Sequence, residues 1–277
     1  ANIFILMLAD LYKKGITKHS DINRAIELNN AWQCGFTTHM NLLVQNQVGY
    51  KNLFKIISDT LTDHFFEGPR LLKSVLQKHR EGILVGSGCS HGEVFEMALN
   101  RSEDDLRRVI GFYDYIEVQP PISYRHLKED LGVEADFIIQ SLIKKIIRVA
   151  KEMNKLVIAT GDVHYLNESD AIYRDIYIRT KLVGGGTHDL ARYETAPLQY
   201  FMTTDEMLDA FKFIGSELAY EIVVTNTNKL NNKIDAIQAF PKSLYSLRDD
   251  AFKDKLGIAS IKDEIYRLVY QKAHQLY

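Results

Sequence analysis

The residues with the clearest metal-binding chemistry follow short apolar stretches of the chain. Asp162 and His164 come directly after the apolar run Leu156–Thr160 and are separated by one residue. In extended backbone, two side chains at this spacing point to the same side. A carboxylate and an imidazole that converge are typical ligands of divalent metals. On its own, the pair is a weak signal, and a surface turn in which Asp and His share a hydrogen bond is the favoured interpretation.

Cys89 lies in a similar position after another apolar run, Ile83–Ser87. Gly88 and Gly92 flank it and allow the backbone to turn tightly. A thiolate there would add a soft ligand that suits zinc. Without that context, a lone cysteine is more often a small buried apolar residue than a ligand.

Other ionisable residues nearby have simpler interpretations. His91 and Glu93 are expected to begin a helix, where they would be exposed and Glu93 would favour the helix dipole. His39 precedes an apolar run instead of following one, so position alone favours a hydrogen-bonded histidine at a strand boundary. Glu117 could hydrogen-bond to metal ligands without binding the ion itself, but an ion pair with a basic neighbour is the favoured interpretation.

The elements that must position these residues alternate between strand and helix from about residue 39. Apolar runs of strand length are Met40–Gln45, Ile83–Ser87, Tyr115–Val118 and Leu156–Thr160. Between them lie segments with helical periodicity: Tyr50–Leu61, Arg70–His79, Glu103–Gly111 and Ala135–Met153. This order predicts an α/β fold with a mainly parallel sheet or barrel, because parallel neighbours need crossover connections. Functional residues of such folds gather at the carboxyl ends of the strands.

The remainder of the chain is predicted to be mostly helical. Helices are expected at Glu168–Lys181, Thr203–Phe211, Glu217–Asn231 and Ser260–Leu276. The apolar stretch Ile3–Tyr12 and the polar residues after it suggest a terminal helix and a linker, or an ordinary helix that packs on the body. Pro241, the charged run 248–250 and Gly257 suggest a second linker.

Composition excludes several classes of protein. Of 277 residues, 34 are Lys or Arg and 36 are Asp or Glu, so no overall positive field draws the chain to nucleic acid. Two cysteines are too few for a disulfide framework, which indicates a reducing, cytoplasmic location. The apolar stretch Ile3–Ala9 is far shorter than the roughly 20 residues that span a bilayer, so no membrane insertion is expected.

Several ordered motifs resemble one family. The run ATGDVHYLN at residues 159–167 looks like the last metal motif of the PHP domain in PolC-type DNA polymerase III alpha subunits. VGSGCSHGE at residues 85–93 resembles that family's cysteine-containing segment, and THMNLLVQNQVGYKNL at residues 38–53 resembles the histidine-led strand and helix before it. YFMTTDEMLDAF at residues 200–211 and EIVVTN at residues 221–226 are similar to its closing helices. The resemblance covers about residues 37–245.

The resemblance implies an incomplete PHP-type distorted (βα) barrel with additional C-terminal helices. Residues 1–36 would be the end of an exonuclease segment and a linker, residues 37–245 the latter part of the PHP domain, and residues 246–277 a linker and the first helix of a polymerase segment. The metal ligands it implies are His39, Cys89, Asp162 and His164. A complete site of this family holds up to three ions, and thiolate plus imidazole suits zinc, whereas manganese would rely on the carboxylate and the histidines. The family's earlier metal motifs, which begin with His-x-His, are missing from this chain.

The function that the resemblance implies is that of a replicative DNA-directed DNA polymerase with 3′-5′ exonuclease, of which this chain is one part. Mg²⁺ would serve the parent polymerase, with DNA and replisome subunits as partners. The isolated chain is expected to be inactive. Two alternatives are a free-standing metal-dependent phosphoesterase of the PHP superfamily, which the missing His-x-His opposes, and a non-catalytic scaffold. Exposed strand edges of a partial barrel suggest a homo-oligomer.

Overall fold

The computed structural model describes residues 37–65, 68–182, 185–240 and 257–276. The chain divides into a large unit that ends at Ile237 and a small unit that begins at Gln238. The predicted exonuclease segment at residues 1–36 lies outside the described residues. The expected boundary between residues 245 and 246 lies outside them as well.

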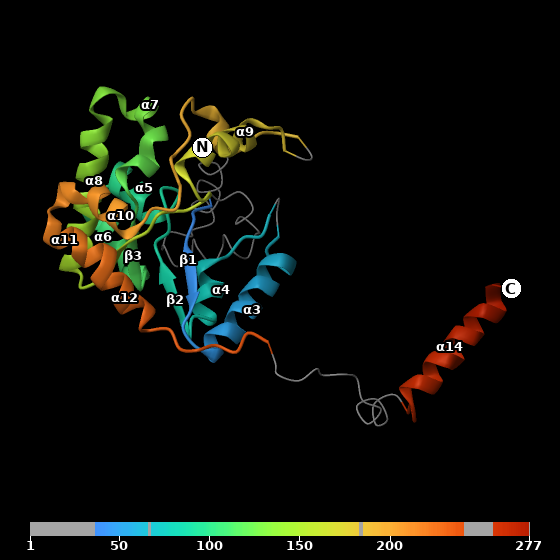
Figure 1. Ribbon diagram of the computed structural model, residues 1–277. Coiled ribbons are helices and arrows are strands. Elements are labelled where there is room, and N and C mark those ends of the chain that lie inside the picture. Colours follow the sequence, from blue (N-terminus) through green and yellow to red (C-terminus); the bar gives the residue numbers. More distant parts are fainter. Residues whose placement is uncertain (1–36, 66–67, 183–184, 241–256, 277) are drawn as a thin grey trace, which may run out of the picture. The chain divides into compact units, whose positions relative to one another are not determined.

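A four-stranded sheet forms the centre of the large unit (Figure 1). Its strands are β1 (Asn41–Val44), β2 (Ile83–Gly86), β3 (Tyr115–Val118) and β4 (Leu156–Ala159), in that spatial order. All four lie within one or two residues of the predicted runs. The pairs β2·β3 and β3·β4 are parallel. The predicted α/β class is therefore confirmed, because helices connect these parallel strands.

The strand β1 departs from the mainly parallel expectation, because it runs antiparallel to β2. Asn41, at the start of β1, pairs with Gly86 at the end of β2. Residues that precede β1 therefore lie beside residues that follow β2. This reversal brings the amino end of one strand to the edge where the carboxyl ends of the other three strands meet.

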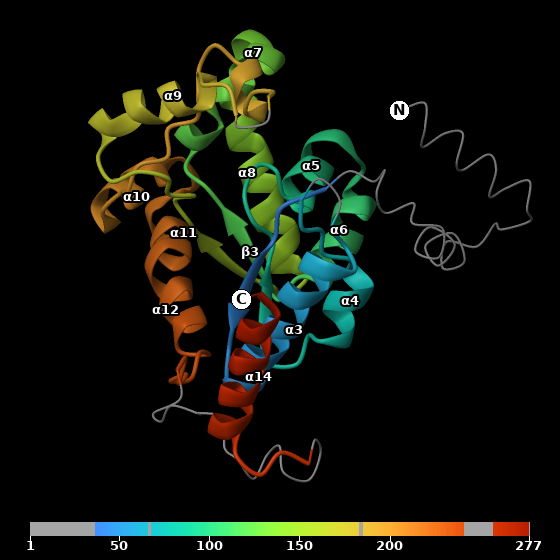
Figure 2. The same ribbon diagram turned by 90° about the vertical axis from the view of Figure 1, so that its right-hand side faces the viewer.

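The two faces of the sheet bury different side chains, since successive residues of a strand point to opposite faces. One face presents Leu42, Val85, Ile116 and Val157 to the main core. The opposite face presents Leu43, Leu84, Tyr115 and Ile158 to a smaller cluster that includes Leu230. In Figure 2, α6 and α8 lie on one side of the sheet and α12 lies on the other.

Helices occupy most of the predicted segments. Before β4 they are α3 (Gln47–Thr62), α4 (Lys73–Lys78), α5 (Glu93–Asn100), α6 (Glu103–Phe112), α7 (Lys128–Leu131) and α8 (Ala135–Glu152). After β4 come α9 (Ala171–Arg179), a 3-10 turn (Asp189–Arg192), α10 (Thr204–Ala210), α11 (Ser216–Tyr220), a π turn (Glu221–Thr225) and α12 (Asn226–Asn231). The small unit contains α14 (Ile261–Leu276). None of the helices within the described ranges combines the length and apolarity that a membrane crossing requires.

Local sequence explains where several of these helices begin. The side chain of Asn46 accepts hydrogen bonds from the backbone N–H groups of Val48 and Gly49 and so caps α3. Thr203 and Glu206 form a reciprocal capping box at the start of α10. On the far side of the sheet, Asn226 of α12 donates a hydrogen bond to the carbonyl oxygen of Val157 in β4 (2.9 Å). The helix α12 is thereby fixed to the last strand.

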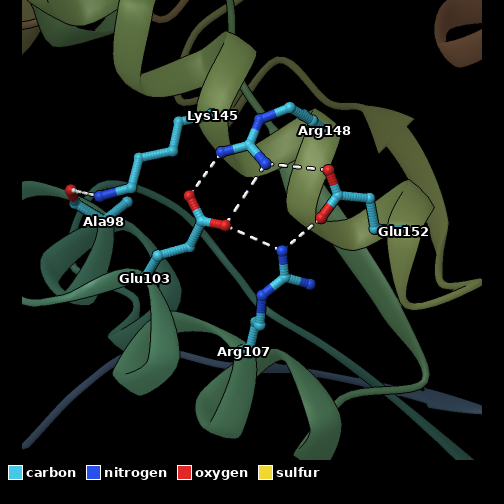
Figure 3. A network of polar contacts seen from close by, with 6 residues as sticks. All are labelled: Ala98, Glu103, Arg107, Lys145, Arg148 and Glu152. Atoms are coloured by element: carbon cyan, nitrogen blue, oxygen red, sulfur yellow. Dashed lines mark hydrogen bonds and ion pairs between the residues drawn. The ribbon is translucent and has the colours of Figure 1, made fainter.

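A network of ion pairs joins α6 to α8 on the surface (Figure 3). Arg107 and Arg148 both donate hydrogen bonds to the Glu103 carboxylate, at 2.8 and 2.5 Å, and both also bind Glu152. The two guanidinium groups hold the pKa of Glu103 down to about 2. All four side chains are partly exposed, so solvent screens their charges. The ion pairs therefore contribute little to the stability of the fold and mainly orient α6 and α8 relative to each other.

A close backbone contact joins α3 to the turn before β2. A Cβ atom at Gly49 would lie 1.7 Å from the carbonyl oxygen of Gly82. That oxygen cannot simply move away, since it accepts a hydrogen bond from the backbone N–H of Gln45 (2.8 Å). Only glycine therefore allows the first turn of α3 to pack at this distance.

The buried carboxylate of Glu117 ties three strand ends together. Its side chain points to the smaller-cluster face from β3 and is 7% exposed. Asn41 of β1 donates to both carboxylate oxygens (2.8 and 3.0 Å), the backbone N–H of Gly88 donates to one (3.3 Å), and the Thr160 hydroxyl donates to the other (3.1 Å). The favoured prediction of a basic partner was wrong, because amide and hydroxyl donors surround this carboxylate. Burial raises the pKa of Glu117, although the bonds from Asn41 and Thr160 oppose the rise.

We expect Glu117→Gln to lower the free energy of unfolding by about 1–3 kcal/mol, the usual range for a buried donor left without an acceptor. The NH₂ of the new amide must face at least one of the N–H or O–H groups that now donate a hydrogen bond to the carboxylate. Urea titration followed by circular dichroism measures the change. Glu81→Gln, a matched substitution at an exposed side chain, should stay within about 0.5 kcal/mol of wild type. Equal effects of the two variants would contradict the role of Glu117.

We expect Gly49→Ala to destabilise the fold by about 2–3 kcal/mol through overpacking against Gly82. Gly111→Ala is the matched control within α6, where the nearest atom to a new Cβ is the Met153 Cε at 3.8 Å. Since alanine favours helix over glycine, that control should gain about 0.5–1 kcal/mol. Denaturant midpoints of the two variants would show shifts of opposite sign. A Gly49→Ala protein as stable as wild type would show that the contact is not tight.

Candidate metal centre

A pocket of about 260 Å³ opens at the edge where the strand ends meet. Its lining comes from all four strands or the turns beside them: His39, Asn41, Gly88, Cys89, Glu117, Gln119, Thr160 and Asp162. Three of the four predicted ligands, His39, Cys89 and Asp162, thus line one cavity.

The reversed direction of β1 explains the position of His39. His39 precedes β1, and because β1 is antiparallel to β2, it lies beside the turn that follows β2. Its backbone N–H donates a hydrogen bond to the carbonyl of His91 (2.9 Å). Its ring atom Nδ1 lies 3.5 Å from Sγ of Cys89. A histidine that position alone assigned to a strand boundary therefore faces the cysteine.

The structure adds His91 to the set. Donor atoms of His39, Cys89 and His91 all lie within 4.8 Å of one another, and among the described residues this is the one such group of three. His91 is exposed, as predicted, but its ring lies 5.2 Å from that of His39 between centroids. Cys89 and His91 share a tight turn, in which the N–H of Gly92 donates to the carbonyl of Cys89 (2.8 Å). This turn brings the side chains of Cys89 and His91 close together. The Cys-x-His spacing, which parallels Asp162-x-His164, was the signal that the sequence offered.

Charge and burial determine the protonation of these groups. Burial and the nearby Asp162 carboxylate raise the pKa of the Cys89 thiol to about 11, so the thiol keeps its proton at neutral pH. Burial, and then the neighbouring His39, lower the pKa of His91. His91 therefore presents a neutral ring with a free lone pair, the form of imidazole that binds metals.

The turn after β4 differs from the extended geometry expected for Asp162 and His164. Asp162 has φ +46°, in the left-handed region, so the alternation of an extended strand does not continue through it. The carbonyl of Asp162 hydrogen-bonds Nδ1 of His164 (2.8 Å), which fixes that nitrogen as the donor. His164 is exposed and is not among the residues that line the pocket. Of the pair, only Asp162 lines the pocket, and the role of His164 as a ligand stays a prediction.

One donor–donor distance matches the spacing of two ligands around a tetrahedral ion. Zinc bonds of about 2.3 Å to sulfur and about 2.0–2.1 Å to nitrogen place the two atoms roughly 3.6 Å apart at a tetrahedral angle. The His39 Nδ1 to Cys89 Sγ distance is 3.5 Å. One thiol and two imidazoles are also the soft donors that zinc prefers. The residues present therefore fit a divalent ion of this class.

A row of aromatic rings extends from the pocket into the protein. His91 stacks on His126 with 6.4 Å between centroids, and His126 meets Tyr193 edge-on at 5.1 Å. Burial lowers the pKa of His126 to about 4, so this ring stays neutral. The row connects the Cys89 turn to the segment around the 3-10 turn Asp189–Arg192.

Comparison with known proteins identifies the relatives of this chain. Residues 6–119 match the PHP domain. The chain is 42% identical over 277 residues to the DNA polymerase III PolC-type of Bacillus subtilis (strain 168) and 39% identical over 277 residues to that of Staphylococcus epidermidis (strain RP62A). It is 37% identical over 275 residues to the protein of the same name from Bacillus cereus.

These matches cover 99–100% of this chain, whereas the chain spans 18% of the length of each relative. The open sheet and its flanking helices agree with an incomplete PHP-type barrel followed by further helices. The resemblance seen in the motifs is confirmed: over its whole length, the chain is homologous to a segment of PolC-type DNA polymerase III that bears the PHP domain.

Proposed function

We propose that this chain is the PHP-domain part of a replicative DNA-directed DNA polymerase. The observation that carries the proposal is 42% identity to a PolC-type DNA polymerase III across all 277 residues. The full-length protein would perform templated DNA synthesis with Mg²⁺ and 3′-5′ exonuclease cleavage, in the cytoplasm, with DNA and replisome subunits as partners. The comparisons give no support to the homo-oligomer expected from exposed strand edges, and it forms no part of the proposal.

We further propose that the pocket holds one divalent metal ion. His39, Cys89 and His91 supply three donors whose atoms already lie close together, and Asp162 lines the same cavity. His164 would join this set only if its ring turned toward the pocket. The thiol and imidazole donors favour zinc over manganese.

The chain's own residues prepare the site. Glu117 holds the backbone at Gly88, next to Cys89, and Thr160, two residues before Asp162. Gln119 adds hydrogen bonds to the Thr160 hydroxyl (2.9 Å) and the Gly88 carbonyl (3.2 Å). When bound, the ion would supply Lewis-acid chemistry toward a phosphoryl oxygen. We propose that the isolated chain is inactive as a polymerase and as a phosphoesterase.

Primer extension tests the parent function. The full-length protein that contains this chain should extend a primed DNA template in Mg²⁺ and the four deoxynucleotides, whereas the pure 277-residue chain should not. Matched protein concentrations and a nuclease control keep the two comparable. The proposal would be contradicted if the 277-residue chain extended the primer on the template, or if the full-length protein did not.

Metal binding should depend on pH through the Cys89 thiol. Because burial and Asp162 raise its pKa to about 11, the thiol is protonated between pH 6 and 9 and must release that proton to bind as a thiolate. Protons thus compete with the ion, and Zn²⁺ affinity should rise about tenfold per pH unit through this single group. His91 adds no proton at neutral pH because its pKa is lowered. Calorimetry in buffers of different ionisation enthalpy measures the proton released.

In Cys89→Ser, Zn²⁺ binding should no longer release the thiol proton. The affinity should fall by about 100-fold or more, which exceeds the 10–100-fold loss typical of residues that only hydrogen-bond to a metal ligand. Chelator competition and elemental analysis report the affinity and the metal content. Cys34→Ser provides the matched control at the chain's other cysteine and should leave both unchanged. Full metal content in Cys89→Ser would exclude the proposed centre.

A further inference from the structure

The segment 199–201 binds the turn that carries Asp162, although Gln199 lies 37 positions after Asp162 in the sequence. The carbonyl of Gln199 accepts hydrogen bonds from the backbone N–H groups of His164 (2.8 Å) and Tyr165 (3.4 Å). Its own backbone N–H donates to the Tyr165 hydroxyl (2.9 Å). Tyr165 and Tyr200 also form a parallel bridge. Gln199 is therefore fixed to this turn by its backbone alone.

The side chain of Gln199 adds a direct bond to the candidate metal centre. Its Nε2 donates to Oδ2 of Asp162 at 2.6 Å. Since an ionised carboxylate only accepts hydrogen bonds, the amide nitrogen must face it, and the orientation of the amide is determined. Asp162 is held at φ +46°, a conformation that non-glycine residues rarely adopt. The bond from Gln199 fixes the carboxylate in that strained turn.

The other half of the same amide has no such partner. Gln199 is 5% exposed, and its Oε1 is buried without a hydrogen bond among the described residues. A buried polar atom without a partner destabilises a fold, and native structures contain few of them. A methionine of similar length would avoid this cost and still fill the space. The glutamine is thus explained by its bond to Asp162 and not by packing.

We propose that Gln199 is a positioning residue of the metal centre, which aims the Asp162 carboxylate at an ion in the pocket. Gln199 is not among the residues that line the pocket, so it acts through Asp162 and is not itself a ligand. The inference rests on the proposed function, because it assigns a role toward the same centre. The inference adds a residue from the segment after α9 to the metal centre, far along the sequence from the motifs that contain His39, Cys89 and His91.

The test compares Zn²⁺ affinity of the 277-residue chain and its variants by chelator competition at one pH. Gln199→Met should weaken binding about 10–100-fold, the range typical of residues that orient a metal ligand. Asp162→Asn should weaken it at least as much. The double variant should match Asp162→Asn, because Gln199 has no carboxylate left to orient.

Tyr165→Phe is the structural control, since it removes a bond to the Gln199 backbone and keeps the bond to Asp162. It should lower the unfolding midpoint in urea while Zn²⁺ affinity changes less than twofold. A loss of affinity in Tyr165→Phe equal to that in Gln199→Met would overturn the inference, because general loosening of the turn would then explain both.

The remaining outcomes separate this inference from the proposed function. Wild-type Zn²⁺ affinity in Gln199→Met would overturn the positioning role alone. So would a loss of affinity in the double variant equal to the product of the losses in Gln199→Met and Asp162→Asn. A wild-type chain that binds no Zn²⁺ would overturn the proposed metal centre and this inference together.

Discussion

The buried carboxylate of Glu117 accepts hydrogen bonds from three separate parts of the chain, and the geometry of the pocket depends on it. The Asn41 amide, the Gly88 backbone N–H and the Thr160 hydroxyl belong to three different strand ends. Each donor is within two residues of a group that lines the centre: His39, Cys89 and Asp162. A desolvated carboxylate needs such donors, since it has no water to replace them. The requirement to satisfy one buried charge thus places three separate segments around one cavity.

Strand direction provides the second constraint. A fully parallel sheet would have placed His39 at the opposite edge from Cys89, at the amino ends of the strands. Because β1 is antiparallel, the residue before it meets the residues after β2, and the parallel bridge between His39 and Gly92 continues that contact beyond the sheet. The prediction from position alone, a hydrogen-bonded histidine at a strand boundary, agrees with the place of His39 before β1 and its contact with Sγ of Cys89 (3.5 Å). The ligand role that the motif resemblance implies for His39 stays a prediction.

Much of the fold could be predicted from the periodicity of apolar residues. The four strands, α8 and α10 lie where the apolar spacing indicated. The details of the site were less accessible. The left-handed conformation of Asp162 has no signature in an Asp-Val-His run. Gln199 lay in a segment without chemical motifs, and its contact with Asp162 depends on how the chain returns after α9. Long-range contacts of this kind are not encoded in local spacing.

The carboxylates of Asp162 and Glu117 in the pocket lining support the proposed cation. Burial raises the pKa of the Cys89 thiol, and the Asp162 and Glu117 carboxylates raise it further, so that sulfur stays neutral in the metal-free pocket. A divalent ion reverses this preference, because it attracts the thiolate and both carboxylates at once. His91 and His126 remain neutral under the same conditions and add no competing positive charge. In the proposed metal centre, the protonation state of Cys89 would therefore change when a cation bound.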